Sequence, residues 1–194
     1  MPRILVTGFG PFGRVIDNPS GRLAAALADA TVDALVLPTS FGRAPALLRE
    51  RLDDRYDTVL LLGVAESNRH FAVEVFGHNF SAARLPCVDG EAPHGVISPG
   101  VPERLAVTLP PEDTLAALSG RIEARRSESA GSYVCNALLF HALLEARAPR
   151  IGFVHVPPDE HTLATPAAHA VPFDAQHEAL AHLVQRLSGL APAP

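Results

Sequence analysis

A cysteine at the start of an apolar helix is the residue of this sequence that is best placed for chemistry. Cys135 follows a turn rich in small residues, 127–132, and lies at the start of an apolar stretch, 134–147, that we expect to form a buried helix. The partial positive charge of a helix N-terminus stabilises a thiolate, and its free backbone N–H groups can bind an oxyanion. The pattern predicts a nucleophilic cysteine, with a buried structural thiol as the alternative.

A thiolate nucleophile needs an imidazole partner, and His155 has the most unusual position among the nine histidines. It interrupts an apolar segment, 150–156, that we expect to form a strand. It lies near the carboxyl end of that strand, where sites in open α/β sheets form. His141 follows Cys135 by six residues on the same expected helix and would face away. The alternative for His155 is a hydrogen-bonded core histidine.

A carboxylate that could orient the imidazole occurs in a third apolar segment. Glu74 lies within 71–76, where the alternation of residue types predicts a strand. Buried glutamates are rare unless they are paired, and catalytic imidazoles are usually oriented by a third group. The alternative is a glutamate on the solvent face of the strand. Together, three unusual residues of complementary type predict a triad of Cys135, His155 and Glu74.

The composition excludes several classes of chemistry. All 16 basic residues are arginines, so no lysine is present to form a Schiff base or to bind a nucleotide phosphate. The formal net charge of -5 argues against a nucleic-acid partner, which needs a basic face. Neither HExxH nor CxxC occurs, and no cluster of His and Cys has ligand spacing. We therefore expect no metal and no cofactor.

The cellular compartment is indicated by what the chain lacks. No segment approaches the roughly 20 apolar residues of a membrane span. The apolar run at the N-terminus is too short for a signal peptide. Cys87 and Cys135 are too few for a disulfide framework, and a reducing compartment would keep both as thiols. We expect a cytoplasmic protein with no membrane partner.

Strands and helices alternate along the chain, which predicts a layered α/β domain with a largely parallel sheet. Strands are expected over 3–7, 32–37, 56–62, 71–76 and 150–156. Helices are expected from Asn18 to about Ala30 and over 44–52, 112–125, 134–147 and 174–188. Segment 77–111, rich in Gly and Pro, is expected to form long loops with a hairpin. We predict one domain over 1–189 and a frayed tail over 190–194.

The loop after the first strand resembles a nucleotide-binding motif without having its features. Residues 8–13 match GxGxxG, but Pro11 lacks the N–H that a phosphate cradle would use. The helix cap at Asn18 also comes several residues too late for a helix that begins on the glycines. Two interpretations remain. Phe9 and Phe12 either pack a tight glycine turn or form the walls of a small apolar pocket.

Four segments together resemble the pyroglutamyl peptidase I family, also called pyrrolidone-carboxylate peptidases. Residues 127–136, SESAGSYVCN, are similar to the nucleophile signature of that family, and 153–157, FVHVP, to its histidine segment. Residues 7–13 with 18–20 are similar to its N-terminal signature, and 63–79 contain its glutamate segment. The order of Glu, Cys and His is the order of the family, and the resemblance spans nearly the whole chain.

The resemblance implies a three-layer α/β/α sandwich with a largely parallel, mixed central sheet. It implies a cysteine peptidase that removes the N-terminal pyroglutamyl residue from peptides through a thioacyl-enzyme intermediate, without a cofactor. Cys135, His155 and Glu74 would be the catalytic triad. The partners would be N-terminally pyroglutamylated peptides, and a homo-oligomer is expected because bacterial relatives are often tetramers.

The same resemblance assigns further roles around the triad. Arg84 would help to stabilise the oxyanion, with a plain surface arginine as the alternative. Phe9 and Phe12 would contribute to the pocket for the pyroglutamyl ring. Asn18 would support that pocket, and it could also cap the following helix.

Three departures from the family pattern leave a second function open. Val64 stands where many bacterial members have glutamine, and Cys87 stands where aspartate is usual. The stretch between Cys135 and His155 is also shorter by a few residues. The alternative is a catalytically silent binding protein on the same scaffold, one that recognises pyroglutamyl or other cyclic-amide ligands without turnover.

Overall fold

The computed structural model describes residues 3–145 and 147–189 of the chain. The frayed tail expected over 190–194 lies outside these residues. Among the described helices, none is both long and apolar enough to cross a membrane. The prediction of one domain over 1–189 stays a prediction.

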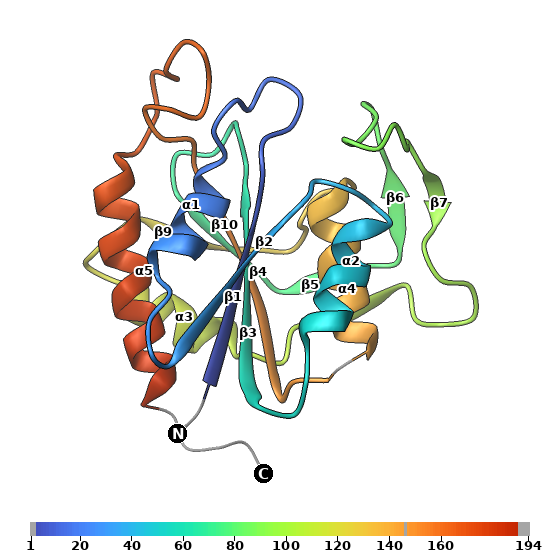
Figure 1. Cartoon of the computed structure of the whole chain (residues 1–194), viewed down its shortest axis with the longest axis horizontal. Helices are drawn as coiled ribbons and strands as arrows, with labels where there is room; N and C mark the ends of the chain where they lie inside the picture. Colours follow the sequence, from blue (N-terminus) through green and yellow to red (C-terminus); the bar gives the residue numbers. More distant parts are fainter. Residues whose placement is uncertain (1–2, 146, 190–194) are drawn as a thin grey trace.

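A six-stranded sheet with the order β2-β1-β3-β10-β4-β9 forms the centre of the molecule (Figure 1). Its strands are β1 (Arg3–Phe9), β2 (Val32–Leu37), β3 (Tyr56–Val64), β4 (Phe71–Glu74), β9 (Ala124–Ser127) and β10 (Arg150–Val156). The pairs among β2, β1, β3 and β10 are parallel. β4 runs antiparallel to β10, and β9 runs parallel to β4. The expected largely parallel, mixed sheet is confirmed.

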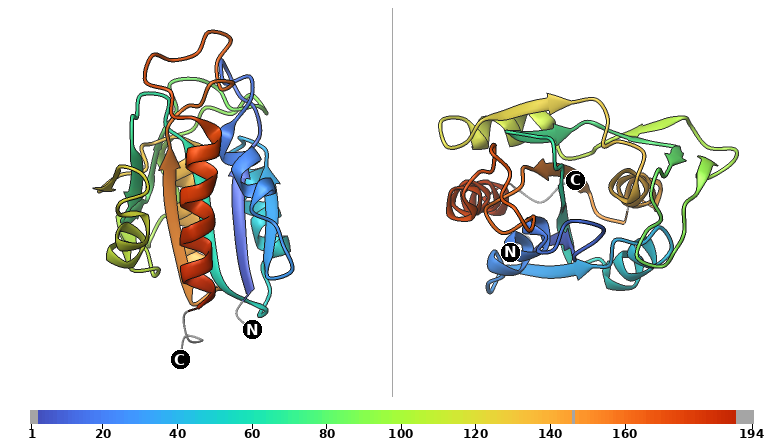
Figure 2. Two further views of the ribbon diagram at one scale, coloured as in Figure 1. Left: turned by 90° about the vertical axis from the view of Figure 1, so that its left-hand side faces the viewer. Right: turned by 90° about the horizontal axis from the view of Figure 1, so that it is seen from above.

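Helices cover both faces of this sheet, which gives the three layers seen in Figure 2. α1 (Pro19–Ala26), α3 (Pro111–Leu118) and α5 (Phe173–Ser188) lie on one face, and α2 (Arg43–Arg51) and α4 (Val134–Glu145) lie on the other. Alternate residues of each central strand enter the two apolar cores. In β1, Ile4 and Val6 pack under α1 and α5, whereas Leu5 packs toward α2 and α4. The sandwich implied by the resemblance is therefore confirmed.

α4 has apolar residues around its whole circumference because other elements of the protein cover two opposite faces of the helix. The sheet lies behind it, and β5 (Phe76–His78) and β8 (Arg104–Ala106) form a two-stranded antiparallel sheet in front of it. β6 (Phe80–Ala82) and β7 (His94–Val96) form a second such sheet beyond. Asn136 of α4, fully buried, accepts a hydrogen bond from the backbone N–H of His78 and donates to the carbonyls of His78 and Phe80. This side chain fixes the covering strands on the helix.

Three elements differ from the expectation. The helix expected from Asn18 to about Ala30 ends at Ala26, with Leu27 as its C-cap. The helix predicted over 112–125 ends at Leu118, because Gly120 adopts a positive φ of 75° that L side chains rarely take. Residues Ala124–Ser127 then form β9, a short edge strand that pairs with β4. Its sequence, ARRS, has no apolar alternation, so periodicity could not reveal it. The strand predicted over 71–76 is also split, since β4 ends at Glu74 and β5 begins at Phe76.

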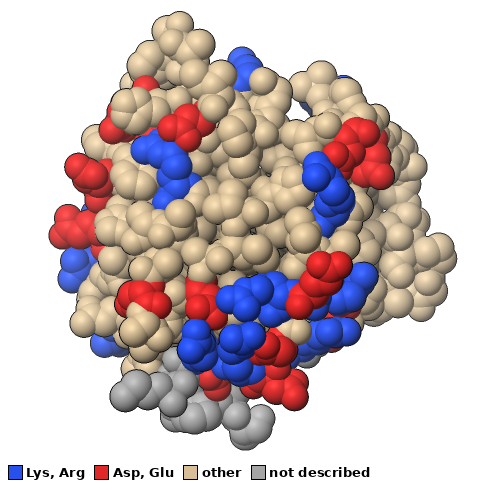
Figure 3. Space-filling view, in the orientation of Figure 1, with Lys and Arg blue, Asp and Glu red and all other residues tan. Residues whose placement is uncertain are grey.

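Charged side chains gather at the amino ends of the parallel strands, the lower edge in Figure 3. Asp33 accepts hydrogen bonds from Arg3 at 2.8 Å, from Arg51 at 3.0 Å and from the Tyr56 hydroxyl at 2.6 Å. Burial, together with the bond to Asp33, raises the pKa of Tyr56 to about 12. This network closes the amino end of the sheet and leaves the carboxyl end for a site.

Candidate active site

The three residues predicted as a triad meet at the carboxyl end of the sheet, below the start of α4. His155 is the second-last residue of β10, and its backbone lies beside Gly63 of β3. Cys135 is the second residue of α4, which places its sulfur at the positive end of the helix dipole. Glu74 is the last residue of β4, on the other side of β10. Three strands and one helix thus position the three side chains.

Glu74 contacts His155 through the antiparallel pairing of β4 and β10. In the register, Glu74 lies opposite Phe153 and His155 lies opposite Ala72, so the two side chains are diagonal neighbours on one face. Glu74 Oε1 accepts a hydrogen bond from His155 Nδ1 at 2.8 Å. Glu74 is only 2% exposed, which excludes the alternative of a glutamate on the solvent face. Within the described chain its Oε2 is buried without a hydrogen-bond partner.

Cys135 contacts the same imidazole from α4. Its sulfur lies beside His155 next to Gly63 and interacts electrostatically with the imidazole, whose ring is buried and packs against the ring of Phe153 at 4.7 Å. Burial alone lowers the pKa of His155, but the negative charges of Cys135 and Glu74, with their hydrogen bonds, outweigh burial and raise it to about 10. The arrangement therefore holds a proton on His155 at neutral pH, next to the sulfur of Cys135.

Gly63 makes this close approach possible, and the sequence reasoning missed it. A Cβ atom at this position would lie 2.9 Å from Cys135 Sγ, 2.8 Å from Phe153 Cζ and 3.2 Å from His155 Cδ2. Real Cβ atoms do not approach other atoms below 3.0 Å, so any side chain here would displace the triad. A glycine inside an otherwise continuous apolar strand was the available signal, because such residues often mark a close approach.

Asn18 is both a helix cap and a support for the first loop. Its Oδ1 accepts hydrogen bonds from the backbone N–H of Ser20 at 3.1 Å and from the Ser20 hydroxyl at 2.8 Å, which begins α1. Its Nδ2 donates to the carbonyl of Gly10 at 3.0 Å, and Ser20 Oγ accepts from the N–H of Phe9. Asn18 is 3% exposed, so it supports the loop from inside the protein and has little solvent-accessible surface.

A pocket of about 350 Å³ lies beside the turn that precedes α4, and it contains two of the predicted site residues. Its lining residues are Phe12, Gly13, Arg14, Glu66, Ala82, Arg84, Leu85, Pro86, Ser132 and Tyr133. Phe12 and Arg84 are thus brought together here. Phe9 is not in this lining: it is 1% exposed and packs in the core under α2 and α4, so the structure gives it a packing role.

Tyr133 is a second residue that the sequence reasoning missed. Its ring lies 6.1 Å from that of Phe12 and 5.3 Å from that of Phe41, and its hydroxyl donates to the carbonyl of Pro86. Tyr133 therefore connects the turn before Cys135 to Phe12 on one wall of the pocket and to Pro86 on the other. An aromatic residue two positions before the cysteine was visible in the sequence, but no rule of spacing marks it as a pocket residue.

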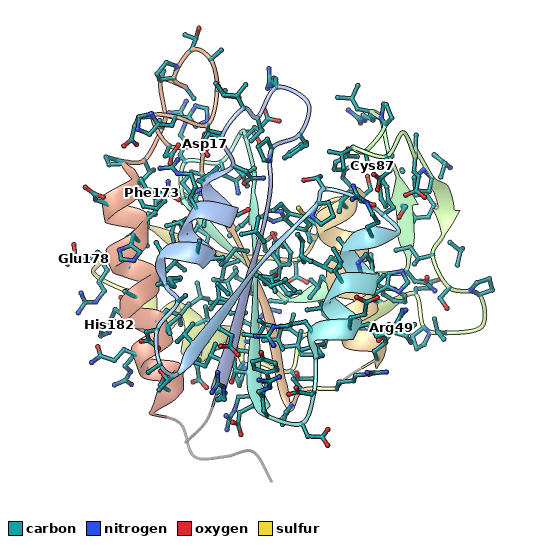
Figure 4. All side chains as sticks on the ribbon, in the orientation of Figure 1. Asp17, Arg49, Cys87, Phe173, Glu178 and His182 are labelled. Carbon is teal, nitrogen blue, oxygen red and sulfur yellow. The ribbon has the colours of Figure 1, made fainter. Side chains whose placement is uncertain are left out.

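A second loop, 157–172, packs against the first one. The backbone N–H of Ile16 donates to the carbonyl of Thr162 at 2.9 Å, and Val15 and Leu163 form a β-bridge. Arg22 anchors this contact: it binds the fully buried Asp159 at 2.7 Å and lies over the ring of Phe173. Figure 4 shows Asp17, another partner of Arg22, close to Phe173. The first loop is therefore held from two sides.

Cys87, labelled in Figure 4, is a buried thiol. Its sulfur lies 3.8 Å from Glu91 Oε2, and both cysteines are free thiols.

Within the part of the chain that the structure describes, no group of three or more His, Cys, Asp or Glu side chains could hold a metal ion.

Comparisons with known proteins agree with this geometry. A family model described as pyroglutamyl peptidase matches residues 2–184. The pyrrolidone-carboxylate peptidase of Gloeobacter violaceus is 37% identical over 166 residues, 80% of this chain and 81% of that protein. The one from Chromobacterium violaceum is 36% identical over 184 residues, 90% of this chain and 87% of that protein.

Two solved structures have the same fold over nearly the whole chain. The pyrrolidone carboxyl peptidase of Pyrococcus furiosus is 30% identical with a TM-score of 0.88, covering 97% of this chain and 100% of that one. The pyroglutamyl peptidase I of Bacillus amyloliquefaciens is 30% identical with a TM-score of 0.87, covering 94% of this chain and 95% of that one.

The close approach at Gly63 gives a first prediction. Gly63→Ala should displace Cys135 from His155, and the rate of alkylation of Cys135 by iodoacetamide near pH 7 should fall about tenfold or more, since an unpaired thiol is mostly protonated there. Gly42→Ala is the matched control, because a Cβ there would meet only ordinary contacts, the nearest at 3.6 Å. Circular dichroism checks that both variants fold. Unchanged alkylation in folded Gly63→Ala would contradict the packing argument.

The proton on His155 gives a second prediction. Glu74→Gln removes one of the two charges that raise the imidazole pKa, so the pKa should fall by about one to three units, as measured by NMR titration of labelled histidine. A raised folded-state pKa stabilises the fold fully below the ordinary value of about 6.5, and this stabilisation is lost as pH rises through about 10. Glu74→Gln should therefore be less sensitive than the parent protein to unfolding in that alkaline window. An unshifted imidazole titration would contradict this assignment.

Proposed function

Because the chain belongs to the pyroglutamyl peptidase family, we propose that Cys135, His155 and Glu74 are the catalytic residues with which it hydrolyses its substrate. The protein is a cysteine hydrolase that removes the N-terminal pyroglutamyl residue from peptides. One observation carries the assignment of residues: the buried hydrogen bond between Glu74 and His155, with the sulfur of Cys135 beside the same imidazole. No other described residues combine a thiol, an imidazole and a carboxylate in this way.

The mechanism follows from the arrangement of the three groups and from the proton held on His155. The Cys135 thiolate attacks the pyroglutamyl carbonyl, and backbone N–H groups at the start of α4 stabilise the oxyanion. His155 donates its proton to the leaving amine, which leaves a thioacyl enzyme. The neutral imidazole then accepts a proton from water, which hydrolyses the thioester and releases pyroglutamate. Glu74 holds the ring with Nδ1 protonated and Nε2 toward the sulfur.

Arg84 is proposed to assist at the oxyanion. It lines the same pocket as Ser132 and Tyr133, which immediately precede the start of α4. Its side chain is exposed and has no hydrogen bond or ion pair with the rest of the described chain, so its donors are available to a ligand. These observations support the role.

The pyroglutamyl ring is proposed to bind at the apolar end of the pocket. Phe12 and Tyr133 supply aromatic walls there, and Leu85 is an exposed apolar side chain on the facing loop. Phe9 supports this end from the core, and Asn18 fixes the loop that carries Phe12 through its bond to Gly10. A small, flat and uncharged ring suits such walls.

The alternative of a catalytically silent binding protein has nothing in its favour. The relatives described above are named as peptidases, and the residues that depart from the family pattern leave the triad intact. Cys87 is buried in the core cluster against which Cys135 also packs, and Val64 ends β3 one residue beyond Gly63.

We also propose a cellular location and an assembly for the protein. A catalytic thiol must stay reduced, so a reducing compartment such as the cytoplasm suits Cys135 and the free Cys87. A homo-oligomer stays a prediction that size-exclusion chromatography with light scattering can test.

The first test of the proposed function is removal of the nucleophile. Cys135→Ala should lower hydrolysis of a chromogenic pyroglutamyl amide to background, because the thiolate provides the covalent route. Cys87→Ser is the matched control and should keep most activity. Full activity in Cys135→Ala, or an equally deep loss in folded Cys87→Ser, would refute the assignment.

The second test concerns the neutral pocket. N-terminal glutamine carries an ammonium whose unpaired burial costs several kcal/mol, so glutaminyl and prolyl amides should be hydrolysed far more slowly than the pyroglutamyl amide. Phe12→Ala should mainly raise KM for the pyroglutamyl amide, with a smaller effect on thermal stability. Equal rates on glutaminyl and pyroglutamyl amides would rule out the pocket argument even if Cys135 proved to be the nucleophile.

A further inference from the structure

Two arginines and one glutamate line the pocket that is otherwise apolar. Arg14, Arg84 and Glu66 are its charged lining residues, which gives the lining a net positive charge. The pyroglutamyl ring is uncharged and is assigned to the aromatic end, so these charges are left to meet another part of the substrate. Beyond the scissile bond, the peptide continues with the first residue after the pyroglutamyl ring. That residue is the part of the substrate that these charges would meet.

Arg14 lies at the tip of a tight turn in the first loop. Phe12 and Val15 exchange backbone hydrogen bonds of 3.1 and 2.8 Å, so Gly13 and Arg14 form a two-residue turn between them. Gly13 has a φ of 50°, the conformation that such turns require and that glycine adopts readily. Val15 is buried, and it forms the bridge to Leu163 described above. The backbone that carries Arg14 is therefore fixed.

Glu66 lies on an equally fixed turn after β3. The N–H of Asn68 donates to the carbonyl of Ala65 at 2.9 Å, and the N–H of Ala65 donates to the carbonyl of Val156. His169 Nε2 contacts the carbonyl of Glu66 itself at 2.9 Å. The carboxylate of Glu66 thus projects into the pocket from a backbone that is held at three points.

Glu66 orients Arg14 and leaves most of its donors free. Arg14 Nε donates to Glu66 Oε2, and within the described chain no hydrogen bond is formed by the two terminal guanidinium nitrogens. The Arg14 side chain is 77% exposed, and an ion pair so exposed contributes little to stability. What the pair does achieve is a fixed direction for a guanidinium whose free edge can bind a carboxylate.

We propose that Arg14, oriented by Glu66, selects substrates that carry a carboxylate on the first residue after the pyroglutamyl ring. The inference rests on the proposed function and names the substrate class of the same site. Two sources offer this chemistry: the free α-carboxylate of a pyroglutamyl dipeptide, and the side chain of Asp or Glu in a longer peptide. Arg84 adds positive charge to the same pocket, whatever its part at the oxyanion.

Two matched pairs of substrates test the inference and distinguish the sources. Pyroglutamyl-alanine is compared with its C-terminal amide, and pyroglutamyl-glutamate amide with pyroglutamyl-glutamine amide. In at least one pair the acid should have a kcat/KM about two- to fivefold higher than its neutral counterpart, the range expected for a partly screened charge. Addition of about 0.5 M salt should reduce that ratio. The pair in which the acid has the higher kcat/KM identifies the source of the carboxylate.

Charge-changing variants assign the selectivity to its residues. Arg14→Gln should bring the acid-to-neutral ratio close to one. Glu66→Gln keeps an oxygen that can accept from Arg14 Nε but loses the negative charge, so its ratio should rise about twofold. Arg49, labelled in Figure 4, and Glu145 form the matched control pair, which joins α2 and α4 and does not line the pocket. Arg49→Gln and Glu145→Gln should leave the ratio unchanged.

The outcomes separate this inference from the function on which it rests. A wild-type ratio of one in both pairs, or an unchanged ratio in Arg14→Gln, overturns the inference, while hydrolysis of the neutral substrates leaves the proposed function standing. A loss of ratio in Arg49→Gln as deep as that in Arg14→Gln also overturns it, because overall charge would then be the cause. No hydrolysis of any pyroglutamyl substrate overturns both.

Discussion

The buried hydrogen bond between Glu74 and His155 is the interaction on which the rest of the structure depends. A carboxylate that is 2% exposed is costly unless a partner offsets its lost hydration, and the imidazolium is that partner. The bond requires β4 beside β10 in an antiparallel register, which explains why an otherwise parallel sheet becomes mixed at this point. The same imidazole meets Cys135 beside Gly63 of β3, where a Cβ would lie 2.9 Å from the sulfur and 3.2 Å from His155 Cδ2.

The two ends of the sheet divide the charged groups of the molecule between them. At the amino end, Asp33 forms ion pairs with Arg3 and Arg51, although Arg3 Nε is buried without a hydrogen-bond partner in the described chain. At the carboxyl end, the charges are fewer and are left in part without partners: Glu74 Oε2 is bonded to no other described atom, and Arg84 faces the pocket. A buried polar atom without a partner, such as Glu74 Oε2, is tolerated where a substrate or a reaction step can use it.

The sequence allowed the triad and the layers to be predicted because both have local signals. A polar residue inside an apolar strand, as at His155 or Glu74, is conspicuous wherever the strand lies in the fold. The residues that were missed have no such signal. β9 owes its conformation to pairing with β4, and Tyr133 and Glu66 owe their position in the pocket to segments distant in the chain. Contacts of this kind depend on tertiary structure, which periodicity and composition do not encode.

The placement of the triad on regular elements has a consequence for how the protein loses its activity. Each of the three side chains comes from a strand or helix of the buried core, and α4 is enclosed between the main sheet and β5 with β8. Segments of this kind open only with the cooperative unit to which they belong, whereas loops open locally at little cost. Separation of sulfur from imidazole therefore requires disruption of the core itself, so thermal inactivation and global melting should coincide in a single transition.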